Sequence, residues 1–289
     1  RWLEKANDLA GPKEVQWGLA LSDFHLRHDR PAQALEAIKK VSGKLPNDLG
    51  VLMAYAKAQI ANRDMAGGKS TLTSATRVAD YNPIPQVQIA LLQLSANNMP
   101  GAAYSLEKAL STQPDFLPAQ ALMTEVELRQ GDAAKAEKRA RDIVVKHPKR
   151  AIGHSLLGDI AVARNQPSAA QESYRRAHQL EPSPETLLRL FGVLGRQDSG
   201  KPALQLAEGW MKTHPTVART QRALADAYAR TGNFGAAKKA YEGLLKIAPE
   251  DGPALNNLAN VLLRLKDPAA ITVAEQAVAK FPGNAAAID

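Results

Sequence analysis

The alternation of apolar and polar positions along the chain is typical of short helices that come in pairs. In residues 151–183, apolar or small residues recur three and four positions apart. The first group is Leu157, Gly158 and Ala161, and the second is Ala170, Tyr174 and Ala177. This spacing places each group on one face of a helix, and a polar interval separates the two groups. Each helix has about 14 residues and spans roughly 21 Å. Helices this short need a neighbour to bury the apolar stripe.

The same two-helix pattern recurs along the chain with a period of 34 residues. Prolines mark the period at Pro12, Pro46, Pro114, Pro148, Pro182, Pro215, Pro249 and Pro282. The one double gap has Asp80 where a proline is missing. When each proline is counted as position 32, eight repeats begin at Val15, Leu49, Pro83, Leu117, Ala151, Pro184, Ala218 and Gly252. Because proline has no N–H to donate, we expect it to end the second helix of each repeat.

The break between the two helices of a repeat falls near position 15. Turn-forming residues stand there, namely Gly131, Gly232 and the pairs Asp29-Arg30 and Asn97-Asn98. Glycine and asparagine tolerate the backbone conformations that tight turns require. We therefore expect a turn between two helices at each of these breaks.

This pattern resembles the tetratricopeptide repeat, a helix-turn-helix unit of 34 residues. The resemblance rests on a large residue at position 7, small residues at 8, 20 and 27, aromatic residues near 11 and 24, and proline at 32. Residues 218–251 show it in Leu224, Ala225, Tyr228, Ala237, Tyr241 and Pro249. It implies an all-α fold, a right-handed α-solenoid of about eight helix pairs with one continuous core. In that family, small residues such as Gly158 let the helices approach closely, and Tyr174 fills the gap to the next repeat.

The repeat register also predicts how the chain is organised. Residues 1–14 read as the C-terminal helix of a preceding repeat, and residues 15–284 as eight repeats that form one continuous solenoid. Residues 285–289 read as the start of a further repeat. We therefore expect the chain to be part of a longer protein.

The composition agrees with a helix-rich interaction protein. The 289 residues are 45% apolar, 5% aromatic and 23% charged, and no run of 18 apolar residues suggests a transmembrane segment. There is no cysteine, which excludes disulfides, thiolate zinc sites and cysteine nucleophiles. The formal net charge of +8 favours acidic partners.

Candidate catalytic and metal-binding motifs are weak. The segment 67–71 resembles the end of a phosphate-binding loop, but Arg63 stands where its first glycine is needed, and the register predicts a helix there. His25 and His28 are three residues apart, yet His25 falls at a position that the repeat buries. We therefore expect no enzyme activity, no cofactor and no metal site.

Two departures from the repeat pattern leave alternatives open. The glycine pair of residues 67–68 marks the weakest repeat, through drift in a tolerant position or through a binding or hinge role. Trp210 occupies position 27, where a small residue is usual. We expect it to pack sideways between neighbouring helices or to accompany a local kink.

The resemblance implies a concave groove lined by the first helix of each repeat, through positions 2, 5, 9, 12 and 13. Position 13 is arginine in five repeats, at Arg27, Arg129, Arg196, Arg230 and Arg264. Three of these follow an acid by four residues, in the pairs Asp23 and Arg27, Glu125 and Arg129, and Asp226 and Arg230, and such pairs neutralise each other along a helix. Arg196 and Arg264 lack that acid, because Gly192 and Asn260 stand there.

We therefore predict a binding groove in the C-terminal half of the chain. Its residues are Arg189, Arg196, Arg219, Arg222, Asp226, Arg230, Asn257, Asn260 and Arg264. The guanidinium group of arginine can donate two parallel hydrogen bonds to a carboxylate. The expected partner is therefore a protein or peptide segment that is acidic or carboxylate-bearing. A solvated charged face is the alternative.

A second basic feature lies on one predicted second helix, which faces outward in this family. Its bases are Lys135, Lys138, Arg139, Arg141, Lys146, Lys149 and Arg150, against Glu137 and Asp142, so the segment carries 7 − 2 = +5. This convex patch could attract an anionic polymer such as a polysaccharide or nucleic acid, or it could be a solvated helix face. No aromatic residue is interleaved, so we do not expect nucleic acid to be the partner.

The closing stretch of residues 255–289 is similar to the late repeats of tetratricopeptide lipoproteins encoded with bacterial exosortase, PEP-CTERM and exopolysaccharide systems. That resemblance implies a periplasmic or outer-membrane-attached location as part of a longer lipoprotein, with exopolysaccharide-system components as partners. A cytoplasmic tetratricopeptide adaptor or regulator is the alternative.

Overall fold

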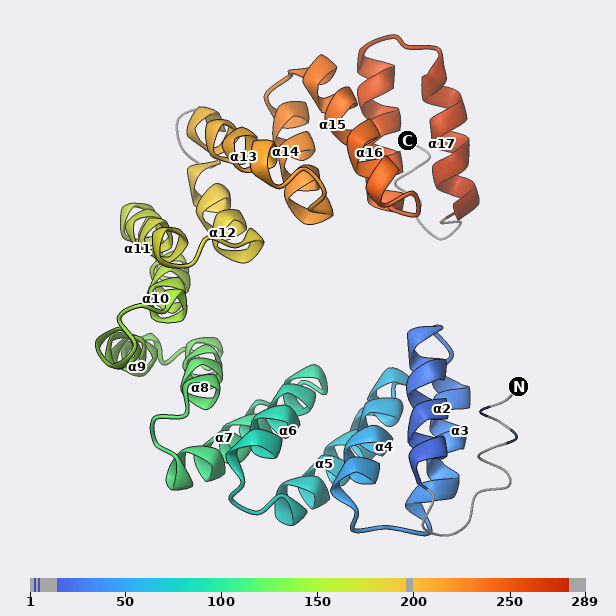
Figure 1. Ribbon diagram of the computed structural model, residues 1–289, viewed down its shortest axis with the longest axis vertical. Helices are drawn as coiled ribbons and strands as arrows, with labels where there is room; N and C mark the ends of the chain where they lie inside the picture. The colour runs from blue at the N-terminus through green and yellow to red at the C-terminus, as the bar shows by residue number, and fades with distance from the viewer. Residues whose placement is uncertain (1–2, 4, 6–14, 196–199, 281–289) are drawn as a thin grey trace. The chain divides into compact units, whose positions relative to one another are not determined.

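The computed structural model describes Leu3, Lys5 and residues 15–195 and 200–280, and the regular structure within them is helical (Figure 1). The chain divides into two compact units, unit 1 of Arg1–Ile143 and unit 2 of Val144–Asp289. The helix expected in residues 1–14 lies outside the described residues apart from Leu3 and Lys5, and the repeat start expected at 285–289 lies outside them altogether.

Four successive helix pairs make up the described part of unit 1, and the last of their helices, α9, ends three residues beyond its boundary at Ile143. They are α2 (Gln16–Arg27) with α3 (Pro31–Ser42), α4 (Leu49–Ala61) with α5 (Met65–Val78), α6 (Pro83–Ser95) with α7 (Met99–Thr112), and α8 (Leu117–Arg129) with α9 (Ala133–Lys146). The second helix of one pair also packs on the first helix of the next, as α3 does on α4, α5 on α6 and α7 on α8. Each pair therefore buries its apolar stripe against its neighbours in sequence.

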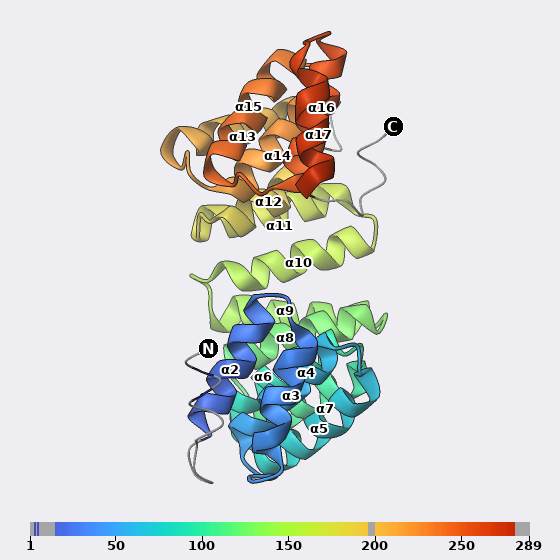
Figure 2. The same cartoon turned by 90° about the vertical axis from the view of Figure 1, so that its right-hand side faces the viewer.

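Unit 2 continues the same arrangement among its described residues. Its pairs are α10 (Ala151–Ala163) with α11 (Pro167–Leu180), α12 (Pro184–Leu194) with α13 (Lys201–Thr213), α14 (Ala218–Arg230) with α15 (Phe234–Ile247), and α16 (Gly252–Arg264) with α17 (Ala269–Lys280). In Figure 2 the helices of the last pair, α16 and α17, lie side by side, as their contacts also show. The all-α fold of about eight helix pairs is confirmed.

The repeat register predicts the helix starts closely. The first helices of seven repeats begin at the predicted residues, and α2 begins one residue later than predicted, at Gln16. The second helices α7, α9, α11, α13 and α15 each end two residues before the proline of their repeat. The exclusion of proline from helix interiors therefore sets these ends as expected.

The turns between the paired helices share one backbone feature. A residue with positive φ stands in each, at Asp29, Arg63, Asn97, Gly131, Asn165, Gly200, Gly232 and Lys266. The turns expected at Gly131, Gly232, Asp29 and Asn97 are therefore confirmed. Glycine and asparagine tolerate this left-handed conformation, whereas Arg63 and Lys266 adopt it at a cost.

Asp80 explains the repeat that lacks its proline. This residue follows the end of α5 and has φ of 49°. Its carbonyl accepts a hydrogen bond from the side-chain amide of Gln86, which is fully buried on α6. A left-handed residue that a buried amide holds in place thus ends this second helix without a proline.

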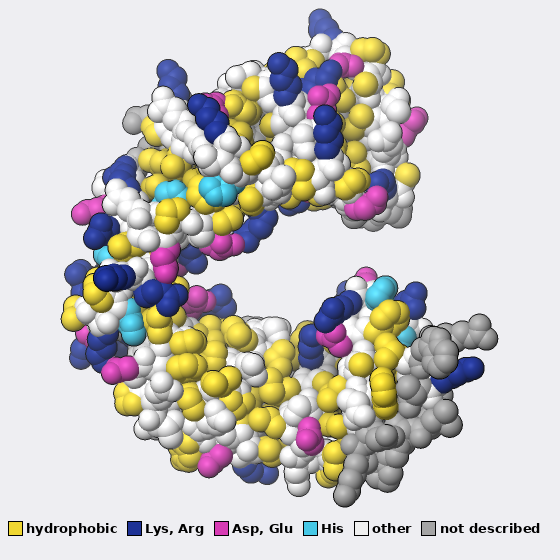
Figure 3. Space-filling model, viewed as in Figure 1, with side chains coloured by type: hydrophobic (Ala, Val, Ile, Leu, Met, Phe, Trp, Pro, Cys, Tyr) yellow, Lys and Arg dark blue, Asp and Glu magenta, His cyan; other side chains and the backbone are white. Residues whose placement is uncertain are grey.

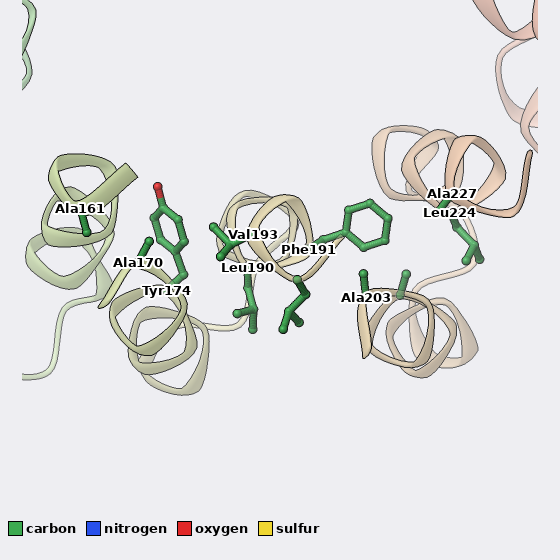
Figure 4. Packing of buried hydrophobic residues seen from close by; sticks show 11 residues of the cluster. Ala161, Ala170, Tyr174, Leu190, Phe191, Val193, Ala203, Leu224 and Ala227 are labelled. Carbon is green, nitrogen blue, oxygen red and sulfur yellow. The ribbon is translucent and has the colours of Figure 1, made fainter. Parts of the chain in front are cut away.

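Apolar clusters fill the space between the stacked helices of each unit. Figure 4 shows the largest cluster of unit 2, to which α10–α14 contribute. Tyr174 lies against Gly158, where an added Cβ would come within 2.3 Å of the ring. A small residue at position 8 therefore lets the tyrosine pack against the first helix of its own repeat.

The glycine pair of α5 is likewise required by close packing. A Cβ at Gly67 would lie 2.2 Å from the Asp64 carboxylate and 2.4 Å from the Gln59 amide, and one at Gly68 would lie 2.8 Å from Ile60. The Asp64 carboxylate caps α5 by accepting from the Gly67 N–H at 2.9 Å. The glycine pair therefore lies in close contact with α4 and beside the cap of α5.

Candidate binding site

A pocket of about 820 Å³ opens in unit 2 between the first helices of the last repeats. Its walls come from α12, α14, α15 and α16, and it is lined by Phe191, Ala223, Asp226, Ala229, Arg230, Phe234, Tyr241, Asn257, Asn260, Val261 and Arg264. Five of these lining residues belong to the predicted groove: Asp226, Arg230, Asn257, Asn260 and Arg264. The structure therefore brings together about half of the residues that were selected from repeat positions.

Asp226 is held in the pocket wall by two neighbours. The Tyr241 hydroxyl of α15 donates to its Oδ1, and the Asn257 amide of α16 donates to the same oxygen at 3.2 Å. Burial raises the pKa of Tyr241, and so does its hydrogen bond to Asp226, so the phenol stays protonated as the donor. The carboxylate is thus tied to two helices other than its own.

The predicted pair of Asp226 with Arg230 is not formed. The two other predicted pairs are present, with Asp23 and Arg27 at 2.7 Å and Glu125 and Arg129 at 3.9 Å. Asp226 points instead toward Tyr241 because the next helices offer it better-placed donors. Arg230 consequently lacks the helix-surface partner that the sequence suggested.

Arg230 and Arg264 are the cations of the pocket. Both side chains are exposed, and no carboxylate of the described residues lies within 4.0 Å of either. Asn260, also exposed, stands one helical turn before Arg264 on α16. The pocket rim therefore presents two guanidinium groups and an amide to solvent, which are donors suited to a carboxylate.

The floor of the pocket is apolar and was not predicted. Phe191 and Val261 are buried, and Phe234 is half-buried. Phe191 stands at position 8 of its repeat, where a small residue is usual, so its size was a signal in the sequence. Its ring extends from α12 toward α14 (Figure 4).

Two other predicted groove residues, Arg189 and Arg219, are engaged in ion pairs outside the pocket. Arg189 binds Asp159, which also accepts from the Tyr174 hydroxyl at 2.6 Å. Arg219 lies 3.2 Å from Glu185, and both side chains are exposed. Arg196 lies outside the described residues.

Arg222 has a structural partner that the sequence did not suggest. It binds Asp251, whose side chain is 3% exposed and caps α16 by accepting from the Ala254 N–H at 3.1 Å. The pair connects α14 to the start of α16, so the charge of Arg222 is largely compensated within the fold.

The basic segment of residues 135–150 is less positive than its run of bases suggested. Arg139 makes two hydrogen bonds to Glu127, at 3.0 and 2.7 Å, and Arg141 lies 2.6 Å from Glu137. Arg150 lies 2.7 Å from Glu181, whose pKa is lowered by the Ala151 N–H and by Arg150. Two of these acids lie outside the segment, so counting charges within it overestimated the surplus.

The remaining polar candidates have structural surroundings. His25 is buried, as its repeat position predicted, and the described residues contain no cluster of histidines and carboxylates that could hold a metal ion. The Trp210 ring stacks on that of His214, which caps the same helix, at 3.8 Å and an interplanar angle of 8°, and it lies 5.6 Å from the ring of His178 on α11. Among the described helices, none is long and apolar enough to span a membrane.

The comparisons agree with the repeat register. Tetratricopeptide-repeat models match residues 125–184 and 218–261, and no curated protein sequence matches the chain significantly. A chain of the APC/C heterotetramer Cut9–Hcn1 is similar to this chain, with 18% identity and a TM-score of 0.54. The match covers 99% of this chain and 57% of the length of that one.

Two further structures are similar over most of their own length. PilW, a type IV pilus biogenesis factor, matches 70% of this chain and 94% of its own, with 18% identity and a TM-score of 0.57. A tetratricopeptide repeat protein from Parabacteroides merdae matches 86% and 98%, with 12% identity and a TM-score of 0.57. At these identities the likeness shows the fold alone. The family models show tetratricopeptide repeats in residues 125–184 and 218–261, and the paired helices of the described residues follow the same pattern, which is a fold consistent with a protein-interaction scaffold.

Proposed function

We propose that unit 2 binds a peptide segment of a partner protein, with an acidic side chain or a carboxylate anchored by Arg230 and Arg264. The observation that carries the proposal is the pairing of two exposed arginines, without a carboxylate partner among the described residues, with an apolar pocket floor. A guanidinium group binds a carboxylate through two parallel N–H bonds, which fixes both position and orientation.

The pocket favours an apolar residue next to the acidic one. Phe191, Phe234 and Val261 offer surface for a side chain, while the arginines lie at the ends of α14 and α16. Asp226 adds a fixed negative charge within the same pocket, which repels a second carboxylate placed there. A segment with one acid and one adjoining apolar residue therefore fits better than a uniformly acidic one.

A peptide titration tests this function. A fluorescein-labelled peptide with one Glu beside one Leu is titrated with the chain, together with a matched peptide in which Gln replaces Glu. We expect Arg230→Ala and Arg264→Ala each to weaken binding by about tenfold, as expected for a charge-assisted hydrogen bond. Arg219→Ala is the control, because Arg219 lies on α14 and pairs with Glu185 outside the pocket. Equal affinity for the Glu and Gln peptides, or an equal loss in the control, contradicts the proposal.

We further propose that the partner belongs to a bacterial envelope system, as the resemblance of the closing repeats implies. The similarity to a pilus biogenesis factor concerns the fold alone and does not separate this role from a cytoplasmic adaptor. The N-terminal sequence of the full-length protein decides between the two. An apolar leader followed by a lipobox cysteine supports the envelope role, and its absence favours the adaptor.

The basic segment of residues 135–150 is a weaker candidate for a second function than its run of bases suggested. Three of its arginines pair with acids, and counting Glu127 and Glu181 together with Glu137 and Asp142 lowers its net charge from +5 to 7 − 4 = +3. The charged surface of unit 2 is also mixed, because Figure 3 shows Asp and Glu side chains among its Lys and Arg side chains.

A further inference from the structure

A second, smaller pocket lies in unit 1 on the side of the second helices. It has a volume of about 170 Å³ between α5, α6 and α7. Its lining consists of Thr73, Thr76, Arg77, Gln93, Gly101, Tyr104 and Lys108. Two cations and no carboxylate line this small space, so its electrostatic character is strongly positive.

Lys108 is the more buried of the two cations. Its side chain is 12% exposed, and its ammonium group lies 4.7 Å from the ring centre of Tyr81 and 6.0 Å from that of Tyr104. Its polar contacts are long, at 3.4 Å to the Thr76 carbonyl and 3.8 Å to Asp80, whose side chain is 75% exposed. A largely desolvated ammonium group with three N–H bonds and only long contacts can accept a further anionic ligand.

Arg77 complements Lys108 from α5. Its side chain is exposed and makes no ion pair with a described residue. Gln93 is buried and accepts from the Asn98 amide at 2.6 Å, and its own amide N–H groups donate to no described residue. The pocket therefore combines two positive charges with neutral N–H donors, which is the donor set that phosphate oxygens require.

The rim of the pocket is aromatic. Tyr104 is 57% exposed and Tyr81 is 49% exposed, although large aromatic side chains usually bury most of their surface. They offer flat apolar surface beside the cations, where the group that carries the anion can rest.

We propose that this pocket binds a phosphate monoester group, with Lys108 and Arg77 as its charge partners. A phosphate monoester is close to a dianion near neutral pH, so its charge matches that of the two cations. A single carboxylate has one negative charge and balances only one of them. The source is a free small phosphate or a phosphorylated side chain of a partner, and the shared phosphate chemistry is what the pocket recognises. This site lies in unit 1, so it is independent of the peptide pocket of unit 2.

Isothermal titration calorimetry of the whole chain at low ionic strength tests the proposal. The probes are inorganic phosphate, a phosphotyrosine peptide, its unphosphorylated form, and succinate as a dicarboxylate. We expect saturable binding of at least one phosphate probe, and binding about tenfold or more weaker in Lys108→Met and in Arg77→Gln. Arg77→Gln changes an exposed side chain, so it preserves the test if Lys108→Met fails to fold.

The matched control is Lys44→Gln, which removes one exposed positive charge from unit 1 outside the pocket. The proposal fails if no phosphate probe binds saturably, if Lys44→Gln weakens binding as much as Arg77→Gln, or if succinate binds as tightly as phosphate. Tighter binding of the phosphopeptide than of inorganic phosphate supports a phosphorylated side chain. Equal binding of both supports a free phosphate.

Discussion

The Tyr241 hydroxyl donates to the Asp226 carboxylate fifteen residues earlier, and Tyr174 makes the same bond to Asp159. The tyrosines occupy position 24 and the acids position 9 of their repeats, so one polar link recurs in two places. Position 6 of the following repeat completes each link, as Arg189 in one case and Asn257 in the other. The link thus connects three successive helices through side chains.

Removing either tyrosine hydroxyl tests the energy of this link. We expect Tyr174→Phe and Tyr241→Phe each to lower the free energy of unfolding by about 1–2 kcal/mol, because a half-buried carboxylate loses one of its donors. Urea denaturation followed by circular dichroism measures it. Tyr104→Phe removes an exposed hydroxyl and serves as the control. If the control costs as much as the other two, the link contributes nothing specific.

The ion pair of Arg139 with Glu127 should be the most sensitive to loss of one partner. The Glu127 side chain is 4% exposed and that of Arg139 is 22% exposed, so both charges are largely removed from water. We expect Arg139→Met to destabilise the chain by about 3 kcal/mol, because it leaves a buried carboxylate without its cation. The double variant Arg139→Met with Glu127→Leu should recover much of that loss in the same urea titration. A double variant no more stable than Arg139→Met contradicts this account.

The helix positions could be predicted because their signals are local. Proline at position 32 ends a helix by its own backbone chemistry, and a small residue such as Gly158 reports how closely two helices approach. Such signals repeat at fixed intervals, so each repeat supports the assignment of the others. Arg230 and Arg264 were placed in one pocket for the same reason, since equal repeat positions lie side by side in stacked pairs.

Other polar partners could not be predicted from neighbouring residues, although the pairs of Asp23 with Arg27 and Glu125 with Arg129 were. Asp226 binds Tyr241 and Asn257 rather than Arg230, and Arg222 binds Asp251, 29 residues further along the chain. These choices depend on how the helices stack, and helix-surface pairs contribute only about 0.2–0.5 kcal/mol against them. The residue type at a single repeat position therefore predicts poorly which arginines lack a carboxylate partner and can bind a ligand.

The left-handed residues Arg63 and Lys266 predict two stabilising substitutions. Their φ values are 63° and 57°, in turns where other repeats have glycine. A residue with a Cβ pays roughly 1 kcal/mol in this conformation, so Arg63→Gly and Lys266→Gly should each raise the free energy of unfolding by about that amount. Gly232→Ala, at φ of 76° in an equivalent turn, should have the opposite effect. Thermal melts of the three variants measure these changes, and a lower melting temperature for both glycine variants contradicts the prediction.

Two half-buried histidines of unit 2 predict a loss of stability in weak acid. Burial lowers the pKa of His178 below its usual 6.5, and the pKa of His154 is lowered by burial and by Arg176. The folded state therefore resists protonation that the unfolded state accepts, so stability is intact above pH 6.5 and falls as the pH drops below it.

We expect His178→Gln, which can keep a hydrogen bond to the Thr186 hydroxyl, to reduce this pH dependence. Urea titrations of both chains between pH 7.5 and about 5 measure the difference. His214 lies exposed beside Trp210, so His214→Gln provides a control with a histidine lost from the same unit. An unchanged slope in His178→Gln, or the same change in His214→Gln, shows that the acid sensitivity arises from other groups.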